Sequence, residues 1–171
     1  KLTAGQAANV KVSVSQSGDL TYALAADTGT ADVLGLNVVG STATSVVNAA
    51  SLVVAGFETL NLTAGSGSKT LYNAAGTTQL TASTDYDSFG FKAVANNDLK
   101  TVTLAGDYAA KVALTSNQAK VTTVDASNNK GGLDLVLGGQ TGTVTVTGSD
   151  TRDVIALGAA GTGGLQIVNT G

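Results

Sequence analysis

Two short segments of the chain pair aspartates in a way that could hold a metal ion. One contains Asp27 and Asp32, the other contains Asp150 and Asp153, and each segment ends in Asp-x-apolar. Calcium takes six to eight oxygen ligands, which carboxylates and backbone carbonyls supply on flexible turns. The segments resemble reduced copies of the calcium-binding repeat G-G-x-G-x-D-x-U-x. We therefore predict calcium as a cofactor, with these four aspartates as metal ligands.

The same aspartates have a simpler alternative role. The segments lack most of the glycines that let backbone carbonyls turn toward the ion, and Arg152 lies between the second pair. Aspartate side chains also cap turns by accepting hydrogen bonds from nearby backbone N–H groups. Turn capping and calcium ligation both remain open at this point.

Other acidic residues give weaker signals. A second acidic, amide-rich region is typical of solvated loops, and it consists of Asp85, Asp87, Asn96, Asn97 and Asp98. The sequence offers few catalytic groups. It has no histidine and no cysteine, so the common general base and the thiolate nucleophile are both absent. A glycosidase pair of Glu58 with an aspartate would need a separation that sequence does not give. We predict that the protein is not an enzyme.

Composition narrows the possible partners. The net charge is -3, and the nine lysines and arginines are scattered without a basic run, which argues against nucleic acid. No apolar stretch approaches the roughly 18 residues of a membrane-spanning helix, so we expect no membrane insertion. Charged residues make up only 12% and aromatic residues 4%. We expect a hydroxyl-rich surface over a narrow core of small aliphatic side chains.

The elements that would position these residues are short β-strands. Apolar residues alternate with polar ones, the pattern of a strand with one buried face. The alternating groups are Val10, Val12 and Val14; Leu34, Leu36 and Val38; Leu60 and Leu62; Val102 and Leu104; Val112 and Leu114; Leu133, Leu135 and Leu137; Val144 and Val146; Ile155 and Leu157; Leu165 and Ile167. The stretch 41–55 has poor helical periodicity and is interpreted as strand or loop. The fold class is all-β.

The strands recur at a regular spacing. From Val102 to Leu165 the apolar pairs repeat about every 10.5 residues, and Glu58–Leu62 matches Lys100–Leu104 at an offset of 42, close to four such intervals. We predict a parallel β-solenoid of the β-helix or β-roll kind, because a thin aliphatic core suits it. A β-sandwich with short strands is the alternative. Residues 1–171 form one β-rich structural domain or a fragment of a longer surface protein.

One strand has a distinctive surface. In the run 141–147, four threonines alternate with other residues and would share one strand face. Stacked threonine rows can bind ice or carbohydrate, but a single row is not an array. Threonine alternating with valine is also the ordinary composition of a half-exposed strand, and we interpret the run that way.

The order of several short motifs resembles a known family. Phe57-Glu58-Thr59-Leu60-Asn61-Leu62-Thr63, Leu99–Asp107, Lys120–Ser127 and Gly131-Gly132-Leu133 are similar to stretches of bacterial surface-layer proteins of the Caulobacter and Campylobacter kind and related RTX-type surface proteins. The resemblance covers about residues 30–158. It implies a secreted structural protein, located extracellularly at the cell surface, that self-associates into a calcium-stabilised lattice, with cell-surface polysaccharide as a further partner. An adhesin or an extracellular-matrix or carbohydrate-binding module of an RTX-type protein is the alternative.

Overall fold

The computed structural model is all-β. It describes residues 1–27, 29–92, 98–114, 118–140, 142–157 and 165–168, with the backbone alone described at residues 50 and 165–168. Thirteen strands and one short helix, α1 (Ala4–Ala7), lie within these residues. The all-β prediction is confirmed.

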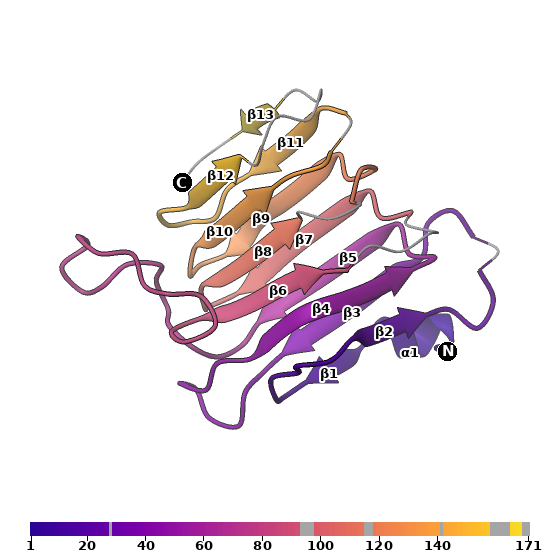
Figure 1. The fold of residues 1–171 in the computed structure, drawn as a ribbon, viewed down its shortest axis with the longest axis horizontal. Helices are drawn as coiled ribbons and strands as arrows, with labels where there is room; N and C mark the ends of the chain where they lie inside the picture. Colours follow the sequence, from indigo (N-terminus) through magenta and orange to yellow (C-terminus); the bar gives the residue numbers. More distant parts are fainter. Residues whose placement is uncertain (28, 93–97, 115–117, 141, 158–164, 169–171) are drawn as a thin grey trace.

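Successive strands alternate between two sheets that lie one behind the other (Figure 1). The odd sheet contains, in spatial order, β1 (Val10–Val12), β3 (Val33–Val38), β5 (Thr59–Ala64), β7 (Thr101–Gly106), β9 (Thr123–Asn129), β11 (Val144–Thr147) and β13 (Leu165–Val168). The even sheet contains β2 (Leu20–Ala23), β4 (Asn48–Ala55), β6 (Asp87–Phe91), β8 (Ala110–Leu114), β10 (Leu133–Leu137) and β12 (Val154–Leu157). Every pairing between these strands is parallel.

The strand register explains the spacing seen in the sequence. Val102 of β7 pairs with Val124 of β9, which pairs with Val146 of β11, so each step within the odd sheet takes 22 residues in this region. One strand of the even sheet lies within each step. The predicted interval of about 10.5 residues is therefore half of one step.

The offset of 42 residues has a different origin from the predicted one. Leu60 of β5 does pair with Val102 of β7, as the matching motifs suggest. Among the described residues, however, only β6 lies between these two strands, so the offset is one enlarged step and not four intervals. Residues 65–86, here called the insertion, take up the extra length and project from the side of the sheets at the left of Figure 1.

The core lies between the sheets and is filled from both. Alternate residues of β3 and β5 are buried, as the period-2 pattern predicts. Most core side chains are Ala, Val and Leu, but three phenylalanines also contribute: Phe57, Phe89 and Phe91.

Some sequence expectations were wrong in detail. Val14 is 60% exposed and lies beyond the end of β1, and Leu157 of β12 is 63% exposed. The stretch 41–55 contains β4 in its second half, in agreement with the strand interpretation. Helix α1, β2 and β6 were not predicted, because none has a clear run of alternating aliphatic residues.

Candidate functional site

Asp153 caps a turn and joins neighbouring strands. It lies directly before β12, and its carboxylate accepts hydrogen bonds from the Ser149 backbone N–H (2.9 Å) and the Ser149 hydroxyl (2.6 Å). It also accepts the backbone N–H of Leu133, the first residue of the neighbouring strand β10, at 2.8 Å. These bonds are what turn capping requires, and they occupy both carboxylate oxygens. Asp150, on the same turn, is exposed.

The first pair of aspartates lies near the other end of the sheets, between β2 and β3. Asp27 is exposed, whereas Asp32 is partly buried and accepts backbone N–H bonds through its carbonyl from Glu58 and Thr59 (both 3.1 Å). The Asp32 Oδ2 atom is buried and has no hydrogen-bond partner among the described residues. The hydrogen bonds that Asp32 makes between the starts of β3 and β5 therefore involve its backbone and not its carboxylate.

The four aspartates do not converge on one site. One pair lies beside β3 and the other beside β11 and β12, at opposite ends of the strand order. Among the described residues, no three Asp, Glu, His or Cys side chains form a group that could hold a metal ion. The carboxylates of either pair alone do not provide the six to eight oxygens of a calcium shell, so calcium ligation at these four positions stays a prediction.

Acidic side chains at strand starts share a structural role that the sequence did not reveal. Glu58, just before β5, accepts the Asp32 backbone N–H at 2.8 Å. Asp87, at the start of β6, accepts the Val47 N–H at 2.8 Å, just before β4. Asp153 makes the same kind of bond to Leu133. In each case the carboxylate accepts a hydrogen bond from a backbone N–H at the start of the preceding strand of the same sheet. The carboxylate thus takes the place of a backbone carbonyl of a neighbouring strand.

Asp87 has the most perturbed environment of these acids. Its side chain is fully buried, and its Oδ2 atom has no hydrogen-bond partner among the described residues. Burial raises the pKa of Asp87 to about 7, and the hydrogen bond from the Val47 N–H opposes this only in part.

The rest of the second acidic region is not assembled around Asp87. Asp85 accepts the Thr81 backbone N–H at 2.7 Å within the insertion, and Asp98 pairs with Lys120 at 2.7 Å. Asn96 and Asn97 lie outside the described residues. Local hydrogen bonds and an exposed ion pair are consistent with ordinary loop roles.

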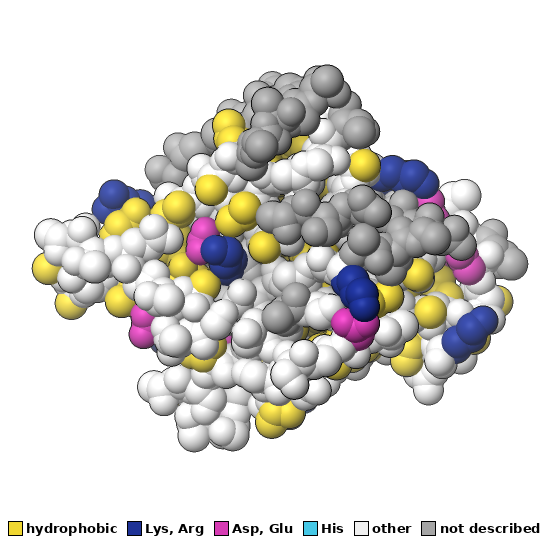
Figure 2. All heavy atoms as spheres, in the orientation of Figure 1, with side chains coloured by type: hydrophobic (Ala, Val, Ile, Leu, Met, Phe, Trp, Pro, Cys, Tyr) yellow, Lys and Arg dark blue, Asp and Glu magenta, His cyan; other side chains and the backbone are white. Residues whose placement is uncertain are grey.

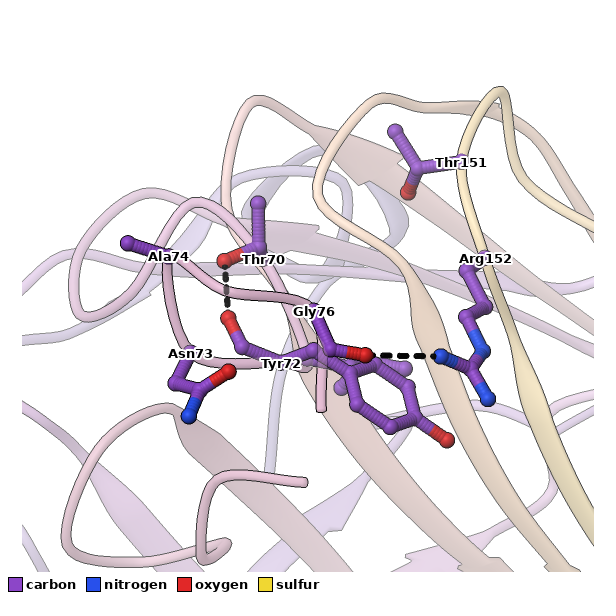
Figure 3. A pocket seen from close by; sticks show the side chains of 8 residues that line it. Thr70, Tyr72, Asn73, Ala74, Gly76, Thr151 and Arg152 are labelled. Atoms are coloured by element: carbon purple, nitrogen blue, oxygen red, sulfur yellow. Dashed lines mark hydrogen bonds between the residues drawn. The ribbon is translucent and has the colours of Figure 1, made fainter. Parts of the chain in front are cut away.

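The insertion has a small core of its own. Leu71 and Tyr86 pack with Ala109, and Tyr72, Leu80, Ala82 and Val154 lie against them. At the base of β12, the Arg152 guanidinium lies 3.8 Å from the centre of the Tyr72 ring and donates to the Gly76 carbonyl at 3.2 Å. Figure 3 shows Arg152, Tyr72 and Gly76 at the edge of a cleft of about 290 Å³. Thr70, Asn73 and Thr151 also line this cleft. A cation over an aromatic face holds the insertion against the sheet.

A second cleft, of about 440 Å³, separates the insertion from the outer face of the even sheet. Its floor is Ser88, Lys111 and Asp134, which are directly paired across β6, β8 and β10. The Tyr86 hydroxyl donates to Asp134 Oδ2 at 2.8 Å, and the Lys111 ammonium lies 3.6 Å from the same oxygen. Burial and the adjacent Asp134 carboxylate raise the pKa of Tyr86, which keeps the phenol protonated. The cleft is polar and its opposite charges are paired.

The tyrosines mostly have packing roles, as expected from sequence. Tyr22 and Tyr108 lie against the main core, and Lys69 lies 5.5 Å from the Tyr108 ring centre. Tyr86, by contrast, also contributes a hydrogen bond to the polar cleft. Its role depends on Asp134, 48 residues away, and no local pattern indicates such a partner.

Charged side chains are sparse on the face drawn in Figure 2. Basic and acidic side chains lie next to one another at several places there, and no large patch of one sign is visible. Lys92 and Asp19, for example, form an exposed ion pair. Within the described residues, no helix is long and apolar enough to cross a membrane.

Comparison with known proteins gives no relative. No family model matches the chain, and no curated protein or solved structure matches it significantly.

Proposed function

We propose that the chain is a parallel β-solenoid that acts as an extracellular structural module of a self-assembling bacterial surface layer. The observation that carries this proposal is the pair of all-parallel ladders, with successive strands alternating between them. Such a stack is held mainly by contacts between neighbouring steps, so it forms a stiff unit of extendable length.

The ends of the ladders favour self-association. Strands β1 and β13 are the edges of the odd sheet, and β2 and β12 are the edges of the even sheet. Edge strands offer unpaired backbone groups to another chain. The Val39 N–H donates to the Val12 carbonyl, so the backbone groups of the adjacent residue Lys11 face away from β3. Pairing at this edge would join one copy to the next.

We propose that calcium acts between molecules rather than within one. Asp27 and Asp150 are exposed, while the Asp153 carboxylate is already committed to turn bonds. Exposed carboxylates from neighbouring copies can share a cation whose ligands no single copy supplies.

A proline at the outward edge position tests the assembly. Lys11→Pro removes an N–H that faces away from β3, and Lys11→Ala is the matched control that keeps it. Light scattering and negative-stain electron microscopy would be recorded over a concentration series, in calcium and in a chelator. We expect ordered assemblies of the parent and of Lys11→Ala, strengthened by calcium, and none of Lys11→Pro. A parent chain that stays monomeric under every condition would contradict the proposal.

The polar cleft supports a second candidate, a carbohydrate-binding module. Its Lys111, Asp134 and Ser88 offer donors and acceptors with paired charge, which suits neutral hydroxyl-rich ligands. A glycan array would be probed with the parent, with Lys111→Met, and with Lys11→Met as a control far along the stack. Binding of one sugar class that is lost only in Lys111→Met would favour the adhesin, and an array without signal would remove this candidate.

A further inference from the structure

The outer face of the odd sheet carries a regular array of threonines. Thr59, Thr101, Thr123 and Thr145 are paired in direct register on β5, β7, β9 and β11. Because the core residues beside them point inward, these side chains point outward, and all four are partly exposed. They form one straight row across four adjacent strands. We call this row, with the row described next, the threonine face.

A second row runs parallel to the first, two residues further along each strand. It consists of Asn61, Thr103, Asp125 and Thr147, again in direct register. The Thr103 hydroxyl donates to Asn61 Oδ1 at 2.9 Å, so neighbouring members of this row are linked. Six of the eight side chains in the two rows are threonines. The four-residue run at 141–147 is thus not isolated: its Thr145 and Thr147 are one edge of a two-dimensional array, while Thr141 lies outside the described residues.

The array is regular in both directions for physical reasons. Neighbouring strands lie about 4.8 Å apart, and residues two apart on one strand are separated by roughly 6.6 Å. The shift in register between β7 and β9 falls beyond Thr103, so both rows lie in the undisturbed part of that ladder. Threonine is branched at Cβ and stiff at χ1. Each of the six threonine positions therefore holds a hydroxyl and a methyl group with little freedom.

Strand propensity alone does not account for this face. The even sheet is built from the same kind of strands, yet its outward positions are mixed. On β6, β8 and β10 the corresponding rows are Ser88, Lys111 and Asp134, then Gly90, Ala113 and Val136. A general preference for threonine in half-exposed strands would act on both sheets. In these paired rows, the threonines lie on the odd sheet alone.

The described segments that pack on the outer faces of the sheets leave this face open. The insertion lies on the even sheet, where its Tyr86 contacts Asp134. Helix α1 packs on β3, where the backbone of Ala8 approaches Gly35 so closely that a Cβ there would lie 2.2 Å from the Ala8 carbonyl oxygen. The array begins at β5, just past this contact.

We propose that the threonine face binds ice. A rigid, two-dimensional lattice of methyl and hydroxyl groups can hold a layer of water at regular positions, which then joins a growing ice surface. A single polysaccharide chain repeats in one direction only, and none of the described aromatic side chains lies in the two rows to stack on a sugar. A peptide would gain nothing from a sheet face whose backbone groups are already paired.

The test compares substitutions on the two faces. Thr123→Tyr places a bulky ring in the middle of the array, and Thr21→Tyr places the same ring at an exposed outward position on β2 of the even sheet. Thermal hysteresis and inhibition of ice recrystallisation would be measured for both variants and the parent, with circular dichroism as the check on folding. Fluorescently labelled parent protein would also be offered to a single-crystal ice hemisphere, a measurement that needs no variant.

We expect the parent and Thr21→Tyr to show equal hysteresis and Thr123→Tyr to lose it while remaining folded. Labelled parent protein should bind defined planes of the hemisphere. Absence of hysteresis and of bound label in the parent would overturn the proposal. Equal activity of Thr123→Tyr and the parent, or retention on insoluble chitin or cellulose without any effect on ice, would overturn it as well.

Discussion

The two sheets are alike on their inner sides and different on their outer sides. Inside, both contribute alternating aliphatic residues to one core. Outside, the odd sheet presents in-register threonines, whereas the even sheet carries a buried polar cluster beneath the insertion. Packing between the sheets requires apolar residues at the inward positions of both. The outward positions are not under that requirement, so the two outer faces can differ in residue type and in role. The predictions below test that division.

The largest effects should come from the shared core and should not depend on the sheet. Leu104→Ala on β7 and Leu135→Ala on β10 each empty a fully buried site. We expect each to lower the free energy of unfolding by about 2–5 kcal/mol, measured by urea denaturation. Unfolding of either variant in two separate transitions would show that the sheets do not share one cooperative core.

Stability should fall as pH rises because of Asp87. Its pKa of about 7 in the folded protein lies above the ordinary value of 3.8, so the folded state keeps a proton that the unfolded state releases. Stability should therefore decrease between about pH 4 and pH 7 and level off above, by up to about 4 kcal/mol. The chain has no histidine or cysteine to obscure this window.

Asp87→Asn provides the control for this pH dependence. Asparagine keeps an oxygen that can accept the Val47 N–H and cannot ionise. Urea denaturation across this pH range should show a markedly flatter profile for the variant. A profile as steep as that of the parent would assign the pH dependence to another group.

A smaller loss should follow removal of the acid that links β10 and β12. Asp153→Ala leaves the Leu133 and Ser149 N–H groups without their partner, at a cost of about 1–3 kcal/mol. Asp150→Ala, three residues earlier and exposed, should change stability little. Thermal unfolding of both variants in calcium-free buffer measures the difference. Equal losses would contradict the capping role of Asp153.

The smallest effect should be confined to the insertion. Arg152→Gln removes the cation from the Tyr72 ring, a contact worth about 0.5–1 kcal/mol. Hydrogen exchange should become faster in residues 70–80 and stay unchanged in the threonine face. Faster exchange in both regions would show that the insertion supports the whole stack.

The regular part of the fold could be predicted from sequence because it is local. Alternation identified β3, β5, β7, β8, β10 and β11, and the spacing of about 10.5 residues corresponds to half a step of the ladder. β6 was missed because it begins with the buried Asp87 and contains Gly90. The insertion was missed because a 42-residue offset fits several intervals as well as one enlarged step.

The candidate sites could be predicted only in part. Turn capping was foreseen as the alternative for Asp153, and its hydrogen bonds bear it out. Its bond to Leu133, the Tyr86–Asp134 contact and the threonine array all depend on register between distant segments. Local residue patterns do not carry that information, because sliding one strand by two residues leaves every inward side chain inward.

The in-register parallel stack can be tested by one distance. The chain has no cysteine, so Val33→Cys/Thr145→Cys allows two nitroxide labels at outward positions of β3 and β11. Four strand spacings separate these residues along the paired row, and double electron–electron resonance should give a narrow distribution near the backbone separation of about 19 Å, broadened by the label linkers. A broad distribution, or one centred beyond about twice that distance, would contradict the parallel stack on which the proposed assembly and the threonine face depend.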